Sequence, residues 1–225
     1  MPGRETPLVK NEIYHVYNRA IASQPIFTSL RDCKRVLDTF FYYQNKILPC
    51  RYAFFIVQSQ DTRDKTLKKL RKLKNFFAEI IAFCFMPNHF HFLLRQKTGN
   101  GISDFLSKFT NSYTRYFNTK TKRFGPLFGG KFKAKRIETQ EQLIHVSRYI
   151  HLNPLTSFLV KSEKDLVKYP FSSLPEYINS SEEIIFCHKM PVLDSFKSKF
   201  NYKKFVFDQA EYQRKLHQIK HLIFE

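Results

Sequence analysis

Two histidines that flank a single phenylalanine form the motif with the clearest chemical potential in this chain. His89 and His91 lie in the apolar run Met86-Pro-Asn-His-Phe-His-Phe-Leu-Leu. In a β-strand alternate side chains share a face, so both imidazoles would point one way and Phe90 the other. Two imidazoles on one face can converge on a divalent cation, whereas positions i and i+2 of a helix do not face each other. A pair of partly buried, hydrogen-bonded histidines is the alternative that this motif leaves open.

A tyrosine and an asparagine on one helix edge supply further chemistry. Tyr149 and Asn153 are four residues apart, so they share an edge of the helix that we expect from residue 139 to residue 153. Thr139 and Gln142 form a capping box that sets the helix start, and Pro154 is expected to end the helix. A phenol with its ordinary pKa of about 10 is a weak nucleophile, but a divalent cation that polarises a phosphodiester offsets this weakness. DNA strand cleavage is therefore possible, and a purely structural tyrosine remains the alternative.

The charge of the chain points to a polyanionic partner. The 225 residues include 38 Lys and Arg but only 19 Asp and Glu, which gives a formal net charge of +19. No apolar run approaches the roughly 20 residues of a membrane span, and the first residues lack the apolar stretch of a signal peptide. We therefore expect a cytoplasmic protein without a membrane partner. The four cysteines are scattered without a C-x-x-C pair, which predicts neither a zinc knuckle nor a disulfide framework.

A basic segment interleaved with aromatic rings follows the histidines. Residues 115–136 contain eight Lys or Arg and no acidic residue. Positive charges neutralise phosphates and rings stack on unpaired bases, a combination typical of proteins that bind single-stranded DNA. Half of the six glycines fall here as well, which predicts a sharply bent loop. We expect DNA contacts from Arg123, Lys131, Lys133, Lys135 and Arg136. The alternative is a solvated strand edge protected by lysines.

The elements that must position these residues alternate along the chain. Apolar and β-branched runs predict strands at residues 12–18, 77–85, 89–95 and 132–137. Apolar residues at helical spacing predict helices at residues 31–46, 61–75, 102–118 and 139–153, of which the second is basic. The order βαββαβα with one inserted helix predicts a ferredoxin-like α+β sandwich with an antiparallel sheet. Tyr113 and Tyr116 follow the apolar stripe of one helix, so we expect them in the core and not as nucleophiles.

Six motifs in one order resemble those of the REP-associated tyrosine transposases, which are single-tyrosine members of the HUH superfamily related to insertion-sequence transposases. The motifs are Met86-Pro-Asn-His-Phe-His-Phe-Leu-Leu, Tyr113-Thr-Arg-Tyr-Phe-Asn118, Gly125-Pro-Leu-Phe, Lys131-Phe-Lys-Ala134, Tyr149-Ile-His-Leu-Asn-Pro154 and Pro170-Phe-Ser-Ser173. The resemblance implies that residues 1–175 form the transposase domain, with the basic insertion at about 61–75. Residues 176–225 would form a helical C-terminal extension, for which hairpin recognition, self-association and structural capping all stay open.

The same resemblance implies roles for the reactive residues. Tyr149 would be the nucleophile, and His89, His91 and Asn153 would hold a divalent metal, Mg²⁺ or Mn²⁺. Asn153 stands where the insertion-sequence branch usually carries Gln. The implied activity is cleavage and rejoining of single-stranded DNA at hairpin sites through a 5′-phosphotyrosine, by a monomer or homodimer associated with the bacterial nucleoid. Two other functions remain open, namely a domesticated, non-catalytic DNA-binding protein and a metal-dependent nuclease that uses water instead of tyrosine.

Overall fold

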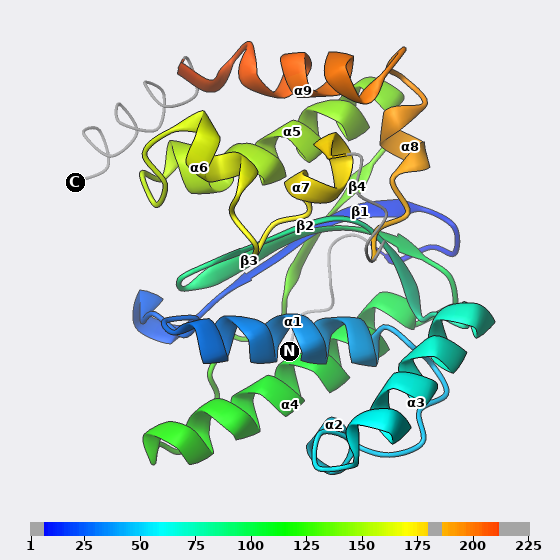
Figure 1. Cartoon of the computed structure of the whole chain (residues 1–225), viewed down its shortest axis with the longest axis vertical. Helices are drawn as coiled ribbons and strands as arrows, with labels where there is room; N and C mark the ends of the chain where they lie inside the picture. The colour runs from blue at the N-terminus through cyan, green and yellow to red at the C-terminus, as the bar shows by residue number, and fades with distance from the viewer. Residues whose placement is uncertain (1–6, 180–185, 212–225) are drawn as a thin grey trace.

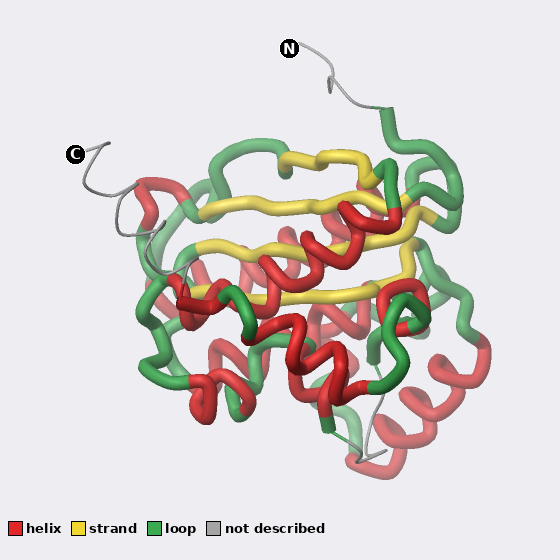
Figure 2. The backbone as a smooth tube through the Cα atoms, turned by 90° about the horizontal axis from the view of Figure 1, so that it is seen from above, coloured by secondary structure: helices red, strands yellow, loops and turns green. Residues whose placement is uncertain are grey.

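A four-stranded antiparallel sheet lies at the centre of the molecule. The computed structural model describes residues 7–179 and 186–211. The strands are β1 (Ile13–Arg19), β2 (Ala78–Met86), β3 (His89–Gln96) and β4 (Lys133–Ile137). They neighbour one another in the order β2-β3-β1-β4 (Figure 2). This order confirms the predicted ferredoxin-like α+β sandwich with an antiparallel sheet.

Helices cover both faces of the sheet (Figure 1). The lower layer in that view contains α1 (Leu30–Tyr43), α2 (Tyr52–Phe55), α3 (Gln60–Leu73) and α4 (Gly101–Thr121). The upper layer contains α5 (Gln140–Thr156), α6 (Glu163–Val167), α7 (Leu174–Ile178), α8 (Met190–Leu193) and α9 (Lys199–Phe207). A single 3-10 turn, η1 (Ile21–Ser23), follows β1. Within the described residues, no helix is long and apolar enough to cross a membrane.

Phenylalanines on β3 build the core beneath the sheet. Phe90 and Phe92 stack with their ring centroids 4.2 Å apart. Phe92 packs 4.4 Å from the ring of Phe40 on α1, and Phe90 lies 6.0 Å from the ring of Phe109 on α4. Because these rings point toward α1 and α4, the alternate residues of β3 face the opposite layer and α5. The alternation of side chains predicted for this strand is confirmed.

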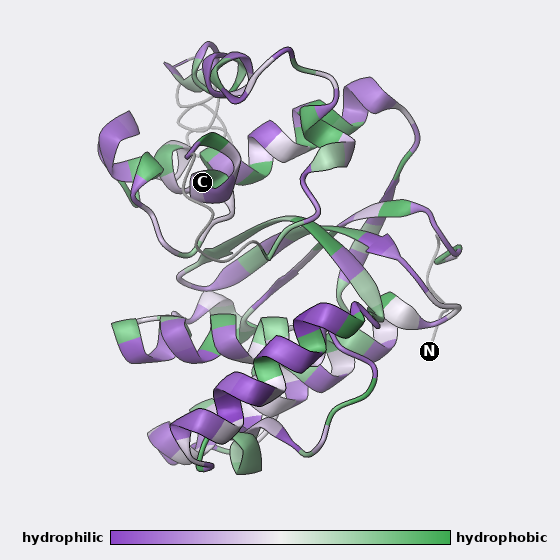
Figure 3. Cartoon of the chain, turned by 45° about the vertical axis from the view of Figure 1, so that its right-hand side comes forward, coloured by the Kyte–Doolittle hydropathy of each residue, from purple (hydrophilic) through white to green (hydrophobic). Residues whose placement is uncertain are grey.

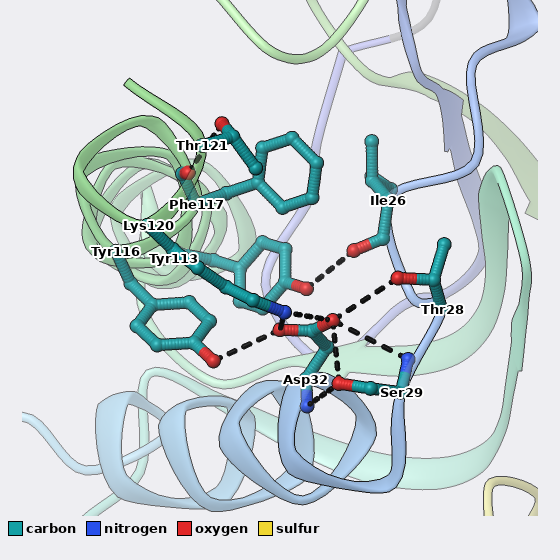
Figure 4. A network of polar contacts seen from close by, with 9 residues as sticks. All are labelled: Ile26, Thr28, Ser29, Asp32, Tyr113, Tyr116, Phe117, Lys120 and Thr121. Carbon is teal, nitrogen blue, oxygen red and sulfur yellow. Dashed lines mark hydrogen bonds and ion pairs between the residues drawn. The ribbon is translucent and has the colours of Figure 1, made fainter. Parts of the chain in front are cut away.

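A buried carboxylate joins α1 to α4 (Figure 4). Asp32 is fully buried. Its oxygens accept hydrogen bonds from Lys120 Nζ at 2.7 Å, from Tyr116 Oη at 2.9 Å and from Ser29 Oγ at 2.7 Å. Burial alone would raise the pKa of this carboxyl, but the hydrogen bonds from these three groups outweigh it and lower the pKa to about 2. Tyr116 therefore has a structural role, as predicted.

The predicted basic insertion is α3. Its residues are mostly hydrophilic, and in Figure 3 this helix lies below the sheet. Ser59 caps its start, because its side chain accepts a hydrogen bond from the Thr62 backbone N–H at 3.3 Å. The short helix α2 that precedes it was not predicted. Its buried residues, Tyr52 and Phe55, are too few for helical spacing to be recognised in the sequence.

Helix α5 begins as predicted but ends later. The Thr139 side chain accepts a hydrogen bond from the backbone N–H of Gln142 at 3.0 Å. Pro154 lies inside the helix, which continues to Thr156, so the predicted end before Pro154 was wrong. Every residue from 150 to 156 is buried, and the Asn153 carbonyl accepts the Ser157 N–H at 3.0 Å. Burial of the last turn outweighs the local preference of the residue before proline.

The segment Pro170–Ser173 closes one edge of the sheet. The Phe85 N–H donates to the Phe171 carbonyl, and the Ser173 N–H donates to the Phe83 carbonyl, each at 2.9 Å. The outer edge of β2 is therefore partly paired. Of the helical C-terminal extension expected at residues 176–225, the described part contains α8 and α9, and residues 212–225 lie outside the described residues.

Candidate active site

His89 and His91 lie side by side on the face of β3 that α5 covers. Their ring centroids are 5.1 Å apart. Pro87 and Asn88 form the turn between β2 and β3, so His89 is the first residue of its strand. His89 Nδ1 lies 2.6 Å from Asn88 Oδ1. The carboxamide oxygen only accepts, so Nδ1 carries the proton and the lone pair of His89 Nε2 remains available.

Helix α5 brings Tyr149 and Asn153 to these histidines. The Tyr149 ring meets the His91 ring edge to face, with centroids 5.3 Å apart. Asn153 follows one turn later and is buried. Its side chain lies close enough to Tyr149 to lower the pKa of the phenol. Its amide nitrogen has no hydrogen-bond partner among the described residues. The structure therefore brings together all four side chains that the sequence singled out for catalysis and metal binding.

Burial keeps both histidines uncharged. Desolvation lowers the pKa of His89 to about 4 and that of His91 to about 2, and neighbouring positive charges act in the same direction. Both imidazoles are therefore neutral near pH 7. Neutral imidazole is the form that coordinates a metal, so no proton has to leave before a cation binds.

The phenol of Tyr149 is protonated at neutral pH. Partial burial of the side chain raises its pKa above the ordinary value, while the Asn153 side chain and the positive charge of Arg19 oppose this effect. The residue as a whole remains 43% exposed, so a substrate can reach it. Tyr149 is thus accessible, but a protonated phenol is a weak nucleophile. A nearby positive charge that lowers its pKa, or a more electrophilic phosphorus, would allow it to react.

The donor set fits a divalent cation of borderline hardness. It consists of two neutral imidazoles and the oxygen of one carboxamide. Among the described residues, no group of three or more His, Cys, Asp or Glu side chains could hold a metal ion. A third protein donor for a cation at this place would be of another type, and the Asn153 amide lies beside Tyr149.

A third histidine, which the sequence analysis did not single out, contacts this site. His15 of β1 places its Nε2 3.0 Å from His91 Nδ1. Its ring also meets the Tyr149 ring edge to face, with centroids 5.9 Å apart. Strand periodicity could have found it, because Tyr14 and Val16 are fully buried in the core and His15 must face the other way. Only the position of β1 beside β3 shows which residues it meets.

Two of the predicted DNA-binding lysines share a face of the sheet with the histidines. In the pairing of β4 with β1, Lys133 lies opposite Tyr17 and Lys135 lies opposite His15. Residues directly opposite one another in an antiparallel pair project to the same face. Both lysines are exposed, and the charge of Lys135 contributes to the lowered pKa of His15. They place positive charge beside the site.

The other predicted DNA-binding residues lie in different surroundings. Lys131 is exposed in the loop before β4. Arg136 alternates with Lys135, so it projects from the other face of β4, where it forms an ion pair with Glu12 at 3.0 Å. Arg123 braces its own loop, because its guanidinium donates to Asn118 Oδ1 at 2.8 Å and to the Pro126 carbonyl at 3.1 Å.

The loop between α4 and β4 is fixed next to the histidine end of the sheet. The Gly129 N–H donates to the Arg19 carbonyl at 2.8 Å, and Arg19 is the strand partner of His89. Gly130 adopts a φ of 77°, in the region that favours glycine, and its carbonyl accepts from Asn18 Nδ2 at 3.2 Å. The positive φ of Gly130 confirms the sharp bend that the glycines predicted for this loop. The basic segment therefore lies beside the site and not at a distance from it.

Comparison with known proteins identifies the family. The family model described as IS200-like transposase matches residues 42–153. The chain belongs to the IS200-like transposases. The matched part of the transposase contains His89, His91, Tyr149 and Asn153, whereas β1 with His15 lies outside it.

A solved structure shares the fold of this transposase. It is described as a REP-associated tyrosine transposase bound to a REP hairpin, and it superimposes with a TM-score of 0.55 at 13% sequence identity. The alignment covers 79% of this chain and 86% of that chain. At this identity the likeness shows a common fold. A search of curated proteins finds no match to the transposase.

Proposed function

We propose that this transposase cleaves and rejoins single-stranded DNA at hairpin sites through a 5′-phosphotyrosine at Tyr149. His89, His91 and Asn153 would hold Mg²⁺ or Mn²⁺. The observation that carries the proposal is the direct contact between the Tyr149 and His91 rings, at 5.3 Å between centroids. A nucleophile and a pair of neutral metal ligands thus lie within reach of a single phosphate group.

In the proposed reaction the Tyr149 oxygen attacks the phosphorus of a phosphodiester. A bond forms between this oxygen and phosphorus, and the bond from phosphorus to the 3′ oxygen of the preceding nucleotide breaks. The phenol loses its proton and the departing 3′ oxygen gains one, which leaves a free 3′-hydroxyl. Attack by another 3′-hydroxyl on the phosphotyrosine reverses these steps and joins two strands, without an external energy source.

The side chains of the site have separate tasks in this reaction. Tyr149 is held by α5 over the histidine face of β3 and remains 43% exposed toward substrate. A divalent cation held by His89, His91 and Asn153 would polarise the scissile phosphodiester and stabilise the charge on its oxygens. Asn153 can take part because its side chain is buried beside Tyr149, and the oxygen of its amide is the atom that would bind the cation.

The proposed substrate rests on charge and on the structural relative. Lys133 and Lys135 project from the same face as His15 and Tyr17, so they can neutralise phosphates next to the reacting one. The relative of the same fold is described with a REP hairpin bound. We therefore propose hairpin DNA with an unpaired flank as the ligand, and the exposed lysines as its contacts along the sheet.

The decisive experiment looks for a covalent adduct. The purified protein is incubated with labelled single-stranded hairpin DNA from its own locus and Mn²⁺ or Mg²⁺, and the products are separated on denaturing gels. We expect a protein–DNA band that disappears in Tyr149→Phe and in His89→Ala. Tyr116→Phe is the matched control, because that tyrosine hydrogen-bonds to Asp32 in the core and should leave the band unchanged.

Two other results would point elsewhere. Cleavage that persists in Tyr149→Phe would indicate a hydrolytic nuclease in which water attacks the phosphorus. Tight binding without a cut or an adduct on all tested hairpins would indicate a DNA-binding protein that no longer catalyses strand transfer.

A further inference from the structure

We infer that His15 is a positioning residue, which holds His91 in the one tautomer able to bind a cation through Nε2. This inference rests on the proposed function, since it assigns His91 as a metal ligand. It extends the site to β1, which neither the motif with the two histidines nor the family match includes.

The geometry places His15 in contact with His91 across two neighbouring strands. His91 lies directly opposite Tyr17 in the pairing of β1 with β3, so His15 is its diagonal neighbour on the same face. The two rings are stacked, with centroids 5.2 Å apart, and His15 Nε2 lies 3.0 Å from His91 Nδ1. That distance is a hydrogen bond, so one of the two nitrogens carries a proton.

The direction of this hydrogen bond decides whether His91 can be a ligand. A neutral imidazole has one N–H and one free lone pair. If His91 donates from Nδ1 to His15 Nε2, the lone pair of His91 Nε2 is free for a cation. If His15 donates instead, His91 carries its proton on Nε2 and cannot coordinate through that atom. Metal binding through Nε2 therefore requires His15 to be the acceptor.

The other histidine of the motif shows the same arrangement with an unambiguous acceptor. Asn88 Nδ2 donates to the Ser23 carbonyl at 2.9 Å, which fixes the orientation of the Asn88 amide. Asn88 Oδ1 is then the atom that accepts from His89 Nδ1, at 2.6 Å. His89 Nε2 is left with its lone pair. His15 provides for His91 what Asn88 provides for His89, so both Nε2 atoms are prepared in the same way.

His15 also restrains the nucleophile. Its ring meets the Tyr149 ring edge to face, with centroids 5.9 Å apart, and lies 5.2 Å from the ring of Tyr17. The imidazole is therefore packed among three aromatic rings and is not free to rotate away from His91. A single side chain thus fixes the tautomer of a ligand and supports the edge of the tyrosine ring.

The test measures Mn²⁺ affinity by calorimetry in the full chain without DNA. We expect His15→Phe, which keeps a ring but removes both nitrogens, to weaken Mn²⁺ binding by roughly tenfold or more, as loss of a hydrogen-bond partner of a metal ligand does. His15→Gln, whose amide oxygen can accept from His91, should recover a large part of the affinity. His188→Phe is the control, because that histidine pairs with Glu79 instead of the site.

A second measurement does not depend on any variant. Long-range ¹H–¹⁵N spectra of the unsubstituted, metal-free protein report which nitrogen of His91 carries the proton. We expect the Nδ1–H form, and the Nε2–H form would overturn the inference. Unchanged Mn²⁺ affinity in a folded His15→Phe would overturn it as well.

His89→Ala and His15→Phe together separate an error in the role of His15 from an error in the metal site itself. If His89→Ala also leaves Mn²⁺ binding unchanged, the metal site itself is wrong. If His89→Ala abolishes binding while His15→Phe does not alter it, the metal site stands and only the role of His15 is rejected.

Discussion

His151 of α5 and Tyr202 of α9 share a buried hydrogen bond, with His151 Nδ1 2.7 Å from Tyr202 Oη. His151 Nε2 lies 2.8 Å from Ser173 Oγ, so this imidazole also contacts the segment that closes the edge of β2. Burial lowers the pKa of His151 to about 3, and the ring is neutral. The helix that carries Tyr149 is therefore fixed between the C-terminal helices and the sheet by a fully buried polar group.

Removal of one hydroxyl should measure how much this connection stabilises the protein. Tyr202→Phe leaves His151 Nδ1 and Ser147 Oγ without their common partner. We expect the free energy of unfolding to fall by about 1–3 kcal/mol, the usual cost of an unsatisfied buried polar group. Urea denaturation measures it, with Phe200→Ala as a control because Phe200 is 72% exposed. Equal stability of Tyr202→Phe and the original protein would show that the hydroxyl contributes nothing.

The Asp32 carboxylate should make stability depend on pH in the acid range. Its pKa falls from 3.8 to about 2 on folding, so the unfolded chain binds the proton more tightly. The stabilisation is complete above the unfolded pKa and is lost as the pH falls toward 2. The lowered pKa corresponds to about 2 kcal/mol at neutral pH. The difference in unfolding free energy between Asp32→Asn and the original protein should shrink by that amount between pH 7 and pH 2. A difference that stays constant over this range contradicts the assignment.

Charge on one face of β4 should control DNA affinity. Lys133→Gln and Lys135→Gln should each weaken binding of single-stranded DNA and lower the slope of log affinity against log salt by about 1. Arg136→Gln is the matched control on the same strand, because Arg136 projects from the other face and pairs with Glu12. Fluorescence anisotropy across a salt series gives both quantities. An equal loss in all three variants would mean that only the total charge matters.

Two glycines near the start of α4 should differ in how well they tolerate alanine. A Cβ at Gly101 would clash with the Phe77 carbonyl oxygen, whereas one at Gly99 would meet nothing within 4 Å. We expect Gly101→Ala to lose about 1–3 kcal/mol or more of stability, because backbone atoms must move. Gly99→Ala should stay within about 0.5 kcal/mol of the original protein. Thermal unfolding of the pair provides the comparison, and similar melting temperatures would refute the predicted clash.

Much of the fold could be predicted because its elements carry long periodic patterns. The alternation around His89 and His91 predicted β3, and the capping box at Thr139 predicted the start of α5. Local patterns did not predict the end of α5, because burial of its last turn keeps Pro154 inside the helix. They did not predict α2 either, because four residues contain too little periodicity.

The site was predictable only as far as its residues share a strand or a helix. His89 with His91, and Tyr149 with Asn153, are related by spacing within one element, so their common face follows from the sequence. The contact of His15 with His91 joins residues 76 positions apart, and it depends on β1 lying beside β3. Likewise, the different surroundings of Lys135 and Arg136 become visible only when the pairing of β4 is known.

The three proposed metal donors, two imidazoles and an amide, are all uncharged, and this has a thermodynamic consequence. A divalent cation held by them keeps its full charge, and the nearby lysines disfavour its entry. A DNA phosphate at the site reduces both penalties, so DNA should strengthen the binding of the cation. By reciprocity the cation must strengthen the binding of DNA by the same factor. The metal and the nucleic acid would therefore assemble on this protein as a cooperative pair, each bound more tightly when the other is present.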